Sequence, residues 1–266
     1  MKLIKYFIIY IILLVCLGIR LDRYFFKKND SFCPKFIQPN WRYCPKNETL
    51  PLSERIKEIF DQPFTYLAKG KQSFVFKSED QQWVIKFIRL PRYARSFSLK
   101  RSEKSSYLTR TLQSCKESYE NLGKETQVAY AHLEPSSSLN KKIHLIDRYQ
   151  KSYFLELDSF PFAVQKYGRS FFSVFYESDK KKKLIKKTIQ LYSKLYEKGY
   201  IDRDPILDKN FGIIGNEPFI LDIGQLEKCE KLPSKADYLW QMTQSLGWKL
   251  QCEFPHLYSY YKNLLQ

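Results

Sequence analysis

The segment Gly199–Leu226 reads GYIDRDPILDKNFGIIGNEPFILDIGQL and combines acidic and amide side chains with a turn pattern. Two apolar runs, Phe211–Ile214 and Pro218–Leu221, are separated by Gly215 and Asn216. A two-residue turn made of Gly and Asn between two apolar runs is a strong short-range signal for a β-hairpin. The segment therefore predicts two antiparallel strands joined by a tight turn.

The predicted hairpin brings two oxygen ligands close together. Asn210 precedes its first strand and Asp222 follows its second strand, while Asp202, Asp204 and Asp208 lie in the loop before Asn210. An amide oxygen beside a carboxylate suits Mg²⁺ bound to a nucleoside triphosphate. The alternative interpretation is a surface turn and hairpin without chemistry.

Two further patterns lie upstream of this segment. The sequence KKKKLIKKTIQLYSKLYEK, residues 180–198, places its apolar residues at helical spacing and predicts an amphipathic helix. Nearer the N-terminus, Ser73–Lys77 and Gln82–Ile88 alternate apolar and polar residues around a polar turn. This alternation predicts a second hairpin, with Gly70 just before it and Lys86 in its second strand. A lysine in such a strand can also be an edge residue that faces solvent.

In this order, these elements resemble the protein-kinase-like fold family, from about Phe64 to the C-terminus. The stretch Val84-Ile85-Lys86-Phe87 is similar to the strand whose lysine contacts the α- and β-phosphates of ATP. The resemblance implies that Gly70 belongs to the turn covering the phosphates, and that Asn210 and Asp222 bind Mg²⁺. It also implies that Asp204 accepts the proton of the acceptor hydroxyl.

The family also carries a helix whose glutamate pairs with the strand lysine. Apolar residues at three- and four-residue intervals predict one long helix from about Ser105 to Leu133. We expect Glu125 to pair with Lys86, with Glu120 as the second choice. The resemblance further implies a hinge at Gln165, Lys166 and Tyr167, where backbone groups would meet adenine.

The sequence departs from the family at several positions. Asp204 stands six positions before Asn210, and Pro205 occupies the position where the family has its catalytic aspartate. Ile223 replaces a phenylalanine, and only residues 225–266 follow Gly224, with two predicted closing helices at 235–250 and 255–265. This short end favours a small or membrane-bound acceptor, or a nucleotide-binding protein that transfers no phosphate.

The predicted fold class is therefore α+β. We expect a two-lobed kinase-like domain over residues 61–266, with a β-rich N-terminal lobe (61–166) and a short helical C-terminal lobe (167–266). A hydrophobic helix (residues 1–28) and a linker (residues 29–60) precede it.

The N-terminal segment favours a membrane location. Tyr6–Ile19 is uninterrupted by charge, which predicts an uncleaved single-pass anchor or, alternatively, a secretion signal. Four basic residues follow it and two precede it, so the positive-inside rule favours a cytoplasmic catalytic domain. Cys33 and Cys44 in the linker resemble the ends of a disulfide loop, which would instead indicate a secreted or extracytoplasmic protein. The alternative is that both are free thiols.

The net charge of +17, from 45 Lys and Arg against 28 Asp and Glu, favours anionic partners. An anionic membrane surface is expected, whereas no spacing indicates a specific nucleic-acid site. Three functions remain open at this point. They are a membrane-anchored kinase-like phosphotransferase that uses ATP and Mg²⁺, a catalytically silent module that binds nucleotide or a partner, and a basic membrane-attached binding protein without a nucleotide site.

Overall fold

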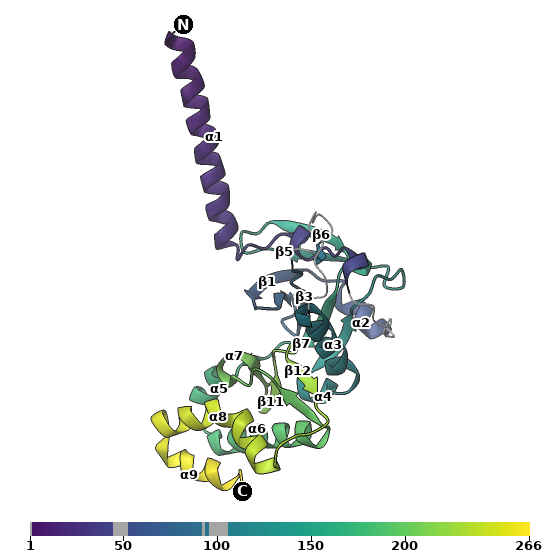
Figure 1. The fold of residues 1–266 in the computed structure, drawn as a ribbon, viewed down its shortest axis with the longest axis vertical. Helices are drawn as coiled ribbons and strands as arrows, with labels where there is room; N and C mark the ends of the chain where they lie inside the picture. The colour runs from purple at the N-terminus through teal and green to yellow at the C-terminus, as the bar shows by residue number, and fades with distance from the viewer. Residues whose placement is uncertain (1, 45–52, 92–93, 96–105) are drawn as a thin grey trace.

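The computed structural model describes residues 2–44, 53–91, 94–95 and 106–266. The chain builds two packed bodies, each with its own hydrophobic core. A curled β-sheet dominates the upper body in Figure 1, helices dominate the lower body, and helix α1 projects away from the sheet. The α+β class predicted from the sequence is confirmed.

The upper body is built on a seven-stranded sheet in the order β4-β7-β3-β2-β1-β5-β6. Strands β1 and β5 are parallel, and the other neighbours in this sheet are antiparallel. The strands are β1 (Phe64–Lys69), β2 (Ser73–Ser78), β3 (Trp83–Ile88), β4 (Val128–His132), β5 (Lys142–Ile146), β6 (Ser152–Glu156) and β7 (Phe162–Lys166). Strand β3, which carries Lys86, lies inside the sheet between β7 and β2 and is buried along most of its length.

The hairpin predicted from alternating residues forms as β2 and β3. In β2, Phe74 and Phe76 point into the core while the residues between them are half-buried. Since side chains alternate between the two faces of a strand, this pattern also sets the face on which each β3 side chain lies.

The single long helix predicted for residues 105–133 is wrong in its second half. Helix α3 (Ser106–Glu120) ends early, a short helix α4 (Gly123–Thr126) follows, and Val128–His132 forms strand β4 beside β7. Gln127 has a left-handed backbone with φ of 57°, which ends the helical path. The apolar residues from Leu122 onward fit helical spacing by coincidence, and pairing with β7 decides their conformation.

The segment predicted as a linker packs as part of the upper core. Phe32 is buried, and its ring meets those of Phe74, Phe76 and Tyr153 edge to face. The segment contains the one-turn helices η1 (Pro34–Phe36) and η2 (Trp41–Tyr43) and the helix α2 (Glu54–Ile59). Cys33 and Cys44 are free thiols, so the structure agrees with that alternative and not with a disulfide loop.

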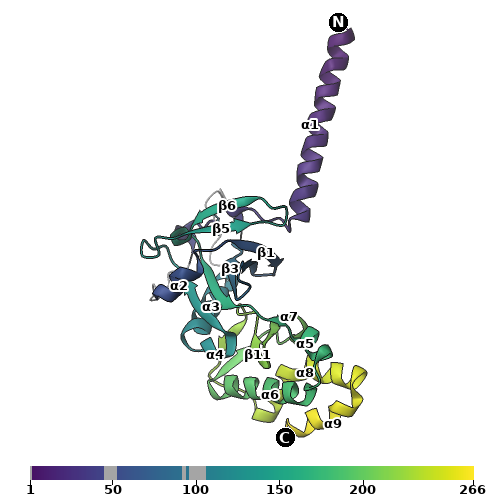
Figure 2. The same ribbon diagram turned by 180° about the vertical axis from the view of Figure 1, so that it is seen from behind.

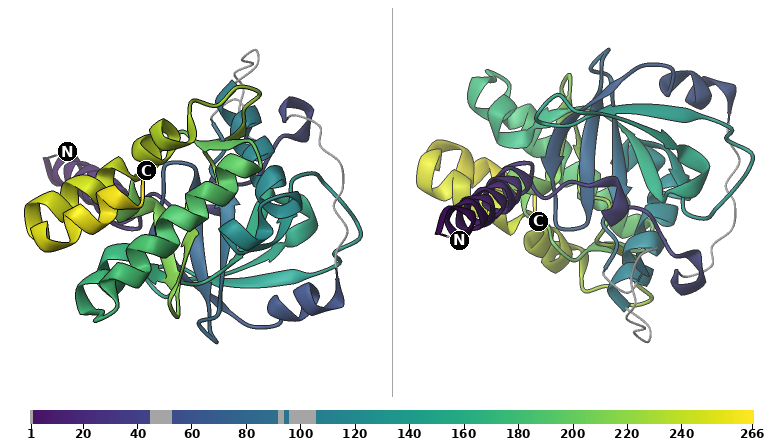
Figure 3. Two further views of the ribbon diagram at one scale, coloured as in Figure 1. Left: turned by 90° about the horizontal axis from the view of Figure 1, so that it is seen from below. Right: turned by 90° about the horizontal axis from the view of Figure 1, so that it is seen from above.

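The lower body packs helices around two small sheets (Figures 2 and 3). Its helices are α5 (Phe171–Glu177), α6 (Lys181–Glu197), α7 (Leu207–Asn210), α8 (Lys235–Glu253) and α9 (Pro255–Asn263). Its strands are β8 (Arg169–Ser170), β9 (Tyr200–Asp202), β10 (Phe211–Ile214), β11 (Glu217–Ile220) and β12 (Leu226–Lys228). The predicted amphipathic helix forms as α6, and its apolar face is buried against α8 and β11.

Helix α1 spans Lys2–Lys28, where the sequence predicts a hydrophobic helix. Its base is tied to the sheet, because Asn29 donates to Asp147 over 2.9 Å and Asp30 accepts from Tyr66 and Arg148. The sequence predicts a single-pass anchor here. Within the part of the chain that the structure describes, no helix has the length and apolarity needed to cross a membrane.

Candidate functional site

Lys86 is buried within the sheet, and its ammonium reaches across to the lower body. Its Nζ donates a hydrogen bond to the carbonyl oxygen of Leu221, directly before Asp222. Burial lowers the pKa of Lys86, because the charged form loses hydration, while the negative charge of Asp222 raises it in part. The lysine therefore does not face solvent as an edge residue.

The β10–β11 hairpin holds Asn210 beside the segment that carries Asp222. Phe211 pairs with Ile220 at the open end of the hairpin. Asn210 and the segment that carries Asp222 therefore lie on either side of this open end. The Asn210 carbonyl accepts from the backbone N–H groups of Leu221, at 2.7 Å, and Asp222, at 3.3 Å. The arrangement follows from the Gly215 and Asn216 turn, since Gly215 has a φ of 61° that suits glycine.

Asp204 contacts the side chain of Asn210, whereas Leu221 and Asp222 contact its backbone carbonyl. The Asn210 side chain donates through Nδ2 to the Asp204 carbonyl over 2.6 Å, so its amide oxygen is the end that remains for a cation. The Asp204 carboxylate is half-buried. The loop thus brings Asp204, Asn210 and Asp222 into one neighbourhood.

The residues present fit part of a magnesium site. One Asp222 oxygen accepts from the Gly224 N–H over 3.1 Å, which leaves the other for a cation, and the Asn210 amide oxygen is a second available ligand. In the described parts of the chain, no cluster of three or more His, Cys, Asp or Glu side chains forms a metal cage. Mg²⁺ is usually held by one or two protein oxygens together with phosphate oxygens and water, which this donor set matches.

Asp202 is a buried carboxyl next to this neighbourhood. Its Oδ1 accepts from the Asp204 N–H over 2.9 Å, and its Oδ2 has no hydrogen-bond partner among the described residues. Burial, assisted by the charges of Asp222 and Asp204, raises the pKa of Asp202 to about 7. Asp202 is therefore partly protonated at neutral pH.

The expected pair of Glu125 with Lys86 does not form. Glu125 lies on α4, and its buried carboxylate accepts from Lys198 of the lower body over 2.9 Å. Glu120, the second choice, pairs with Lys116 on the same helix α3, with 4.0 Å between Lys116 Nζ and Glu120 Oε1. The prediction failed because the helix it assumed ends before Glu125, which turns this side chain to another partner.

Helix α3 presents a thiol near Lys86. Cys115 is buried, and burial raises its pKa to about 12 although the Lys86 ammonium opposes that rise. The preceding residue, Ser114, donates to the Ile223 carbonyl over 2.5 Å and accepts from the Leu226 N–H over 2.8 Å. Helix α3 is thus fixed to the Asp-Ile-Gly segment by a serine and meets the lysine with a neutral group.

The predicted hinge residues have mainly structural partners. Gln165 is buried and donates through Nε2 to the carbonyls of Thr126, at 2.5 Å, and Ile220, at 2.9 Å. The backbone N–H of Lys166 donates to Gln127, and that of Tyr167 donates to Gln82. These backbone donors are already used, so a base at the hinge would have to use other groups or displace these bonds.

The turn containing Gly70 closes onto the Asp-Ile-Gly segment. Gln72, in the same β1–β2 turn, is buried, and its Nε2 donates to the Gly224 carbonyl over 3.2 Å. Arg89 holds the turn from the other side by donating to the carbonyls of Gly70, at 2.7 Å, and Lys71, at 3.0 Å. The loop expected to cover phosphates is therefore in contact with the segment that follows Asp222.

Gln72, Cys115 and Asp202 were not predicted as site residues. Cys115 could have been found as a core residue, because it falls on the apolar face of the predicted helix. Asp202 belongs to the acidic loop noted in the sequence, but its burial, like that of Gln72, depends on contacts between distant segments.

No family model matches this chain, and no curated protein matches it. Solved structures of WbdD are similar. A high-resolution crystal structure of WbdD is 13% identical with a TM-score of 0.44, over 78% of this chain and 46% of that one. A structure of the bifunctional kinase-methyltransferase WbdD is 10% identical with a TM-score of 0.36, over 73% of this chain and 42% of that one. This chain spans less than half the length of either.

Contact between Gln72 and Gly224 predicts a specific coupling. A methyl group on Gly224 would lie 2.1 Å from the Gln72 Oε1 atom, so Gly224→Ala must displace that side chain and its hydrogen bond. We expect Gly224→Ala to lower the free energy of unfolding by about 1 kcal/mol or more. In a Gln72→Ala background the same change should cost much less. Urea denaturation of the four proteins measures this cycle, and strictly additive effects would contradict the contact.

The Asp202 carboxyl predicts a pH dependence of stability. The folded protein keeps the Asp202 proton up to a pKa of about 7, whereas the unfolded chain releases it at about 3.9. Between these values the folded state binds more protons, so this group makes the free energy of unfolding fall as pH rises, by up to about 1.4 kcal/mol per pH unit.

Asp202→Asn should remove this contribution, because the amide does not titrate. Denaturation of the wild type and the variant between pH 4 and 8 measures the difference in slope. Asp208→Asn is the control, since Asp208 is exposed. Equal slopes in the wild type and Asp202→Asn would show that Asp202 is ionised throughout.

Proposed function

We propose that this protein binds Mg·ATP between its two bodies and transfers a phosphoryl group to an acceptor hydroxyl. The observation that supports this most strongly is the position of the Lys86 ammonium, which bonds to the Leu221 carbonyl next to Asp222. A lysine from the sheet and a carboxylate and amide from the lower body are the groups that triphosphate chemistry needs together.

Each residue has a separate role in this proposal. Lys86 binds the α- and β-phosphates as a point charge, while Asn210 and Asp222 hold Mg²⁺ and so neutralise developing charge. Asp204 orients the acceptor hydroxyl and accepts its proton. Catalysis then depends chiefly on position and electrostatics, because phosphoryl transfer needs little covalent help from the protein.

A nucleotide-binding module without transfer is the second candidate, because Pro205 stands where the resemblance places the catalytic aspartate. Two contacts bear on nucleotide binding in either candidate. Gln72 bonds to Gly224 over 3.2 Å, which closes the β1–β2 turn onto the segment after Asp222. The N–H groups of Lys166 and Tyr167 already have backbone partners. Both contacts must open or adapt for a nucleotide to bind as proposed. A basic binding protein without a nucleotide site is the third candidate, supported by the net charge of +17.

Removal of the Asp222 carboxylate tests the nucleotide proposal. We expect Mg·ATP to raise the melting temperature of the full chain, and Asp222→Asn to weaken Mg·ATP binding at least about tenfold because a metal ligand is lost. Lys71→Ala, at an exposed position of the β1–β2 turn, should bind nearly as well as wild type. Isothermal titration with ATP, with and without Mg²⁺, measures these affinities.

The outcomes separate the three candidates. Binding with ADP formation in the presence of an acceptor supports the phosphotransferase. Binding that Asp222→Asn abolishes, without ADP formation for any acceptor tested, supports the silent module. An absence of Mg·ATP binding to the wild-type chain contradicts both and leaves the basic binding protein.

We also propose that α1 attaches the protein to an anionic lipid surface, with the two bodies on the cytoplasmic side where ATP is present. Its apolar side chains are exposed on all sides, including Phe7, Leu13 and Leu17 at 64%, 62% and 54%. Arg20, Arg23, Lys27 and Lys28 gather at the end of α1 that joins the sheet. This order matches apolar side chains in lipid with basic residues beside anionic headgroups.

Vesicle flotation tests the attachment. The chain should float with vesicles containing phosphatidylserine, and replacing Arg20, Arg23 and Lys27 with Gln should weaken binding by about 1 kcal/mol per residue. Exchanging three lysines of α6 (Lys182, Lys183 and Lys186) for Gln is the control of equal charge. Equal loss in both triple variants would show that general charge, rather than α1, carries the attachment.

A further inference from the structure

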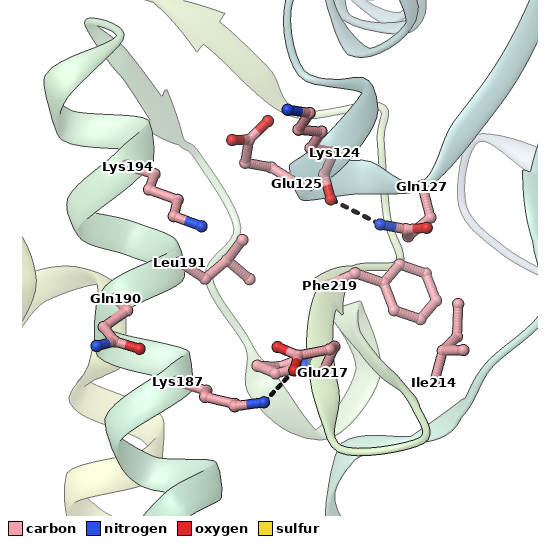
Figure 4. A pocket seen from close by; sticks show the side chains of 11 residues that line it. Lys124, Glu125, Gln127, Lys187, Gln190, Leu191, Lys194, Ile214, Glu217 and Phe219 are labelled. Carbon is pink, nitrogen blue, oxygen red and sulfur yellow. Dashed lines mark hydrogen bonds and ion pairs between the residues drawn. The ribbon is translucent and has the colours of Figure 1, made fainter.

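A cavity of about 290 Å³ lies between α4, α6 and the β10–β11 hairpin (Figure 4). It does not involve Lys86, Asp204, Asn210 or Asp222. Its lining comes from both bodies of the molecule, because α4 and Gln127 adjoin the upper sheet while α6 and the hairpin belong to the lower body. An occupant would therefore contact both bodies at once.

The charges around this cavity do not cancel. Lys187 pairs with Glu217, and Lys198, just outside the lining, pairs with Glu125 over 2.9 Å. These two pairs satisfy both carboxylates that line the cavity. Lys124 and Lys194 also line it and have no ion-pair partner among the described residues. In Figure 4 the Lys194 side chain extends from α6 into the gap toward α4.

Most of the remaining wall is apolar, and Gln127 and Gln190 complete it. Leu191 lies one turn before Lys194 on α6, and Ile214, Pro218 and Phe219 line the side formed by the hairpin. In Figure 4 the Leu191 side chain projects into the same gap, and Phe219 and Ile214 lie across from it. The site therefore combines an uncompensated positive end with an apolar surface.

We propose that this cavity binds a small anion with an apolar body, such as a phosphate monoester or a carboxylate that bears an aromatic or aliphatic group. The anionic group lies between Lys124 and Lys194, where charge-assisted hydrogen bonds to two ammonium groups replace its hydration. The apolar part covers Leu191 and Pro218. This site is separate from the proposed nucleotide site and does not depend on it.

Phenyl phosphate is a suitable probe, because it carries both parts in one molecule. Its binding to the full chain is followed by NMR of the methyl groups of Leu191 and Ile214 at 0.15 M NaCl, where weak attraction to distant surface charges is screened. Two matched probes each lack one part. Inorganic phosphate lacks the apolar body, and benzyl alcohol lacks the charge. We expect each to bind about tenfold more weakly than phenyl phosphate.

Charge variants locate the anion. Lys194→Gln and Lys124→Gln should each weaken phenyl phosphate binding about tenfold, while Lys186→Gln, which removes the same charge from an exposed position on α6, should leave it unchanged. All three positions are exposed, so the variants are expected to fold. The Asp222→Asn variant should bind the probe as wild type does, which separates this cavity from the nucleotide site.

Three results would overturn the proposal. The first is no saturable shift of the Leu191 and Ile214 methyl signals by phenyl phosphate. The second is equal binding of inorganic phosphate, which would show that surface lysines attract anions without a defined pocket. The third is equal loss in Lys186→Gln and Lys194→Gln, which would assign the effect to net charge.

Discussion

The buried ammonium of Lys86 is the constraint on which the arrangement of the two bodies depends. A buried charge that lacks a partner is costly, so the lysine must have both a hydrogen-bond acceptor and a nearby negative charge. The Leu221 carbonyl supplies the first and Asp222 the second. Both belong to the segment after β11, so stabilising the lysine also holds the lower body against the sheet.

The contacts around Lys86 reinforce the same junction. Ser114 of α3 bonds to both Ile223 and Leu226, and Gln72 bonds to Gly224. The Asp222–Gly224 segment and its neighbours are therefore held by hydrogen bonds from the sheet, from helix α3 and from the β1–β2 turn. Helix α3 places Cys115, and not a carboxylate, near Lys86. Asp222 is therefore the negative charge that acts on this lysine.

Away from Lys86, the two bodies meet through a different kind of contact. Gln165 ties β7 to Thr126 and Ile220, and Lys198 reaches from the lower body to Glu125. Glu125 also lines the cavity drawn in Figure 4. The same glutamate that was expected to serve the nucleotide site thus helps to form the edge of another site.

The sequence by itself determined the local elements. Alternating residues specified β2 and β3, the Gly215 and Asn216 turn specified the β10–β11 hairpin, and apolar spacing specified α6 and α8. These signals depend on neighbours in the chain, so they also placed Asn210 next to the segment of Asp222. Lys86 could be assigned to a strand for the same reason.

Only the tertiary structure decided which side chains meet across the chain. Val128–His132 reads as helix but forms a strand, because an edge of β7 is available for pairing. The partner of Glu125, the burial of Asp202 and the contact of Gln72 each join segments that lie far apart in sequence. Such contacts depend on how whole elements pack, and no local spacing carries that information.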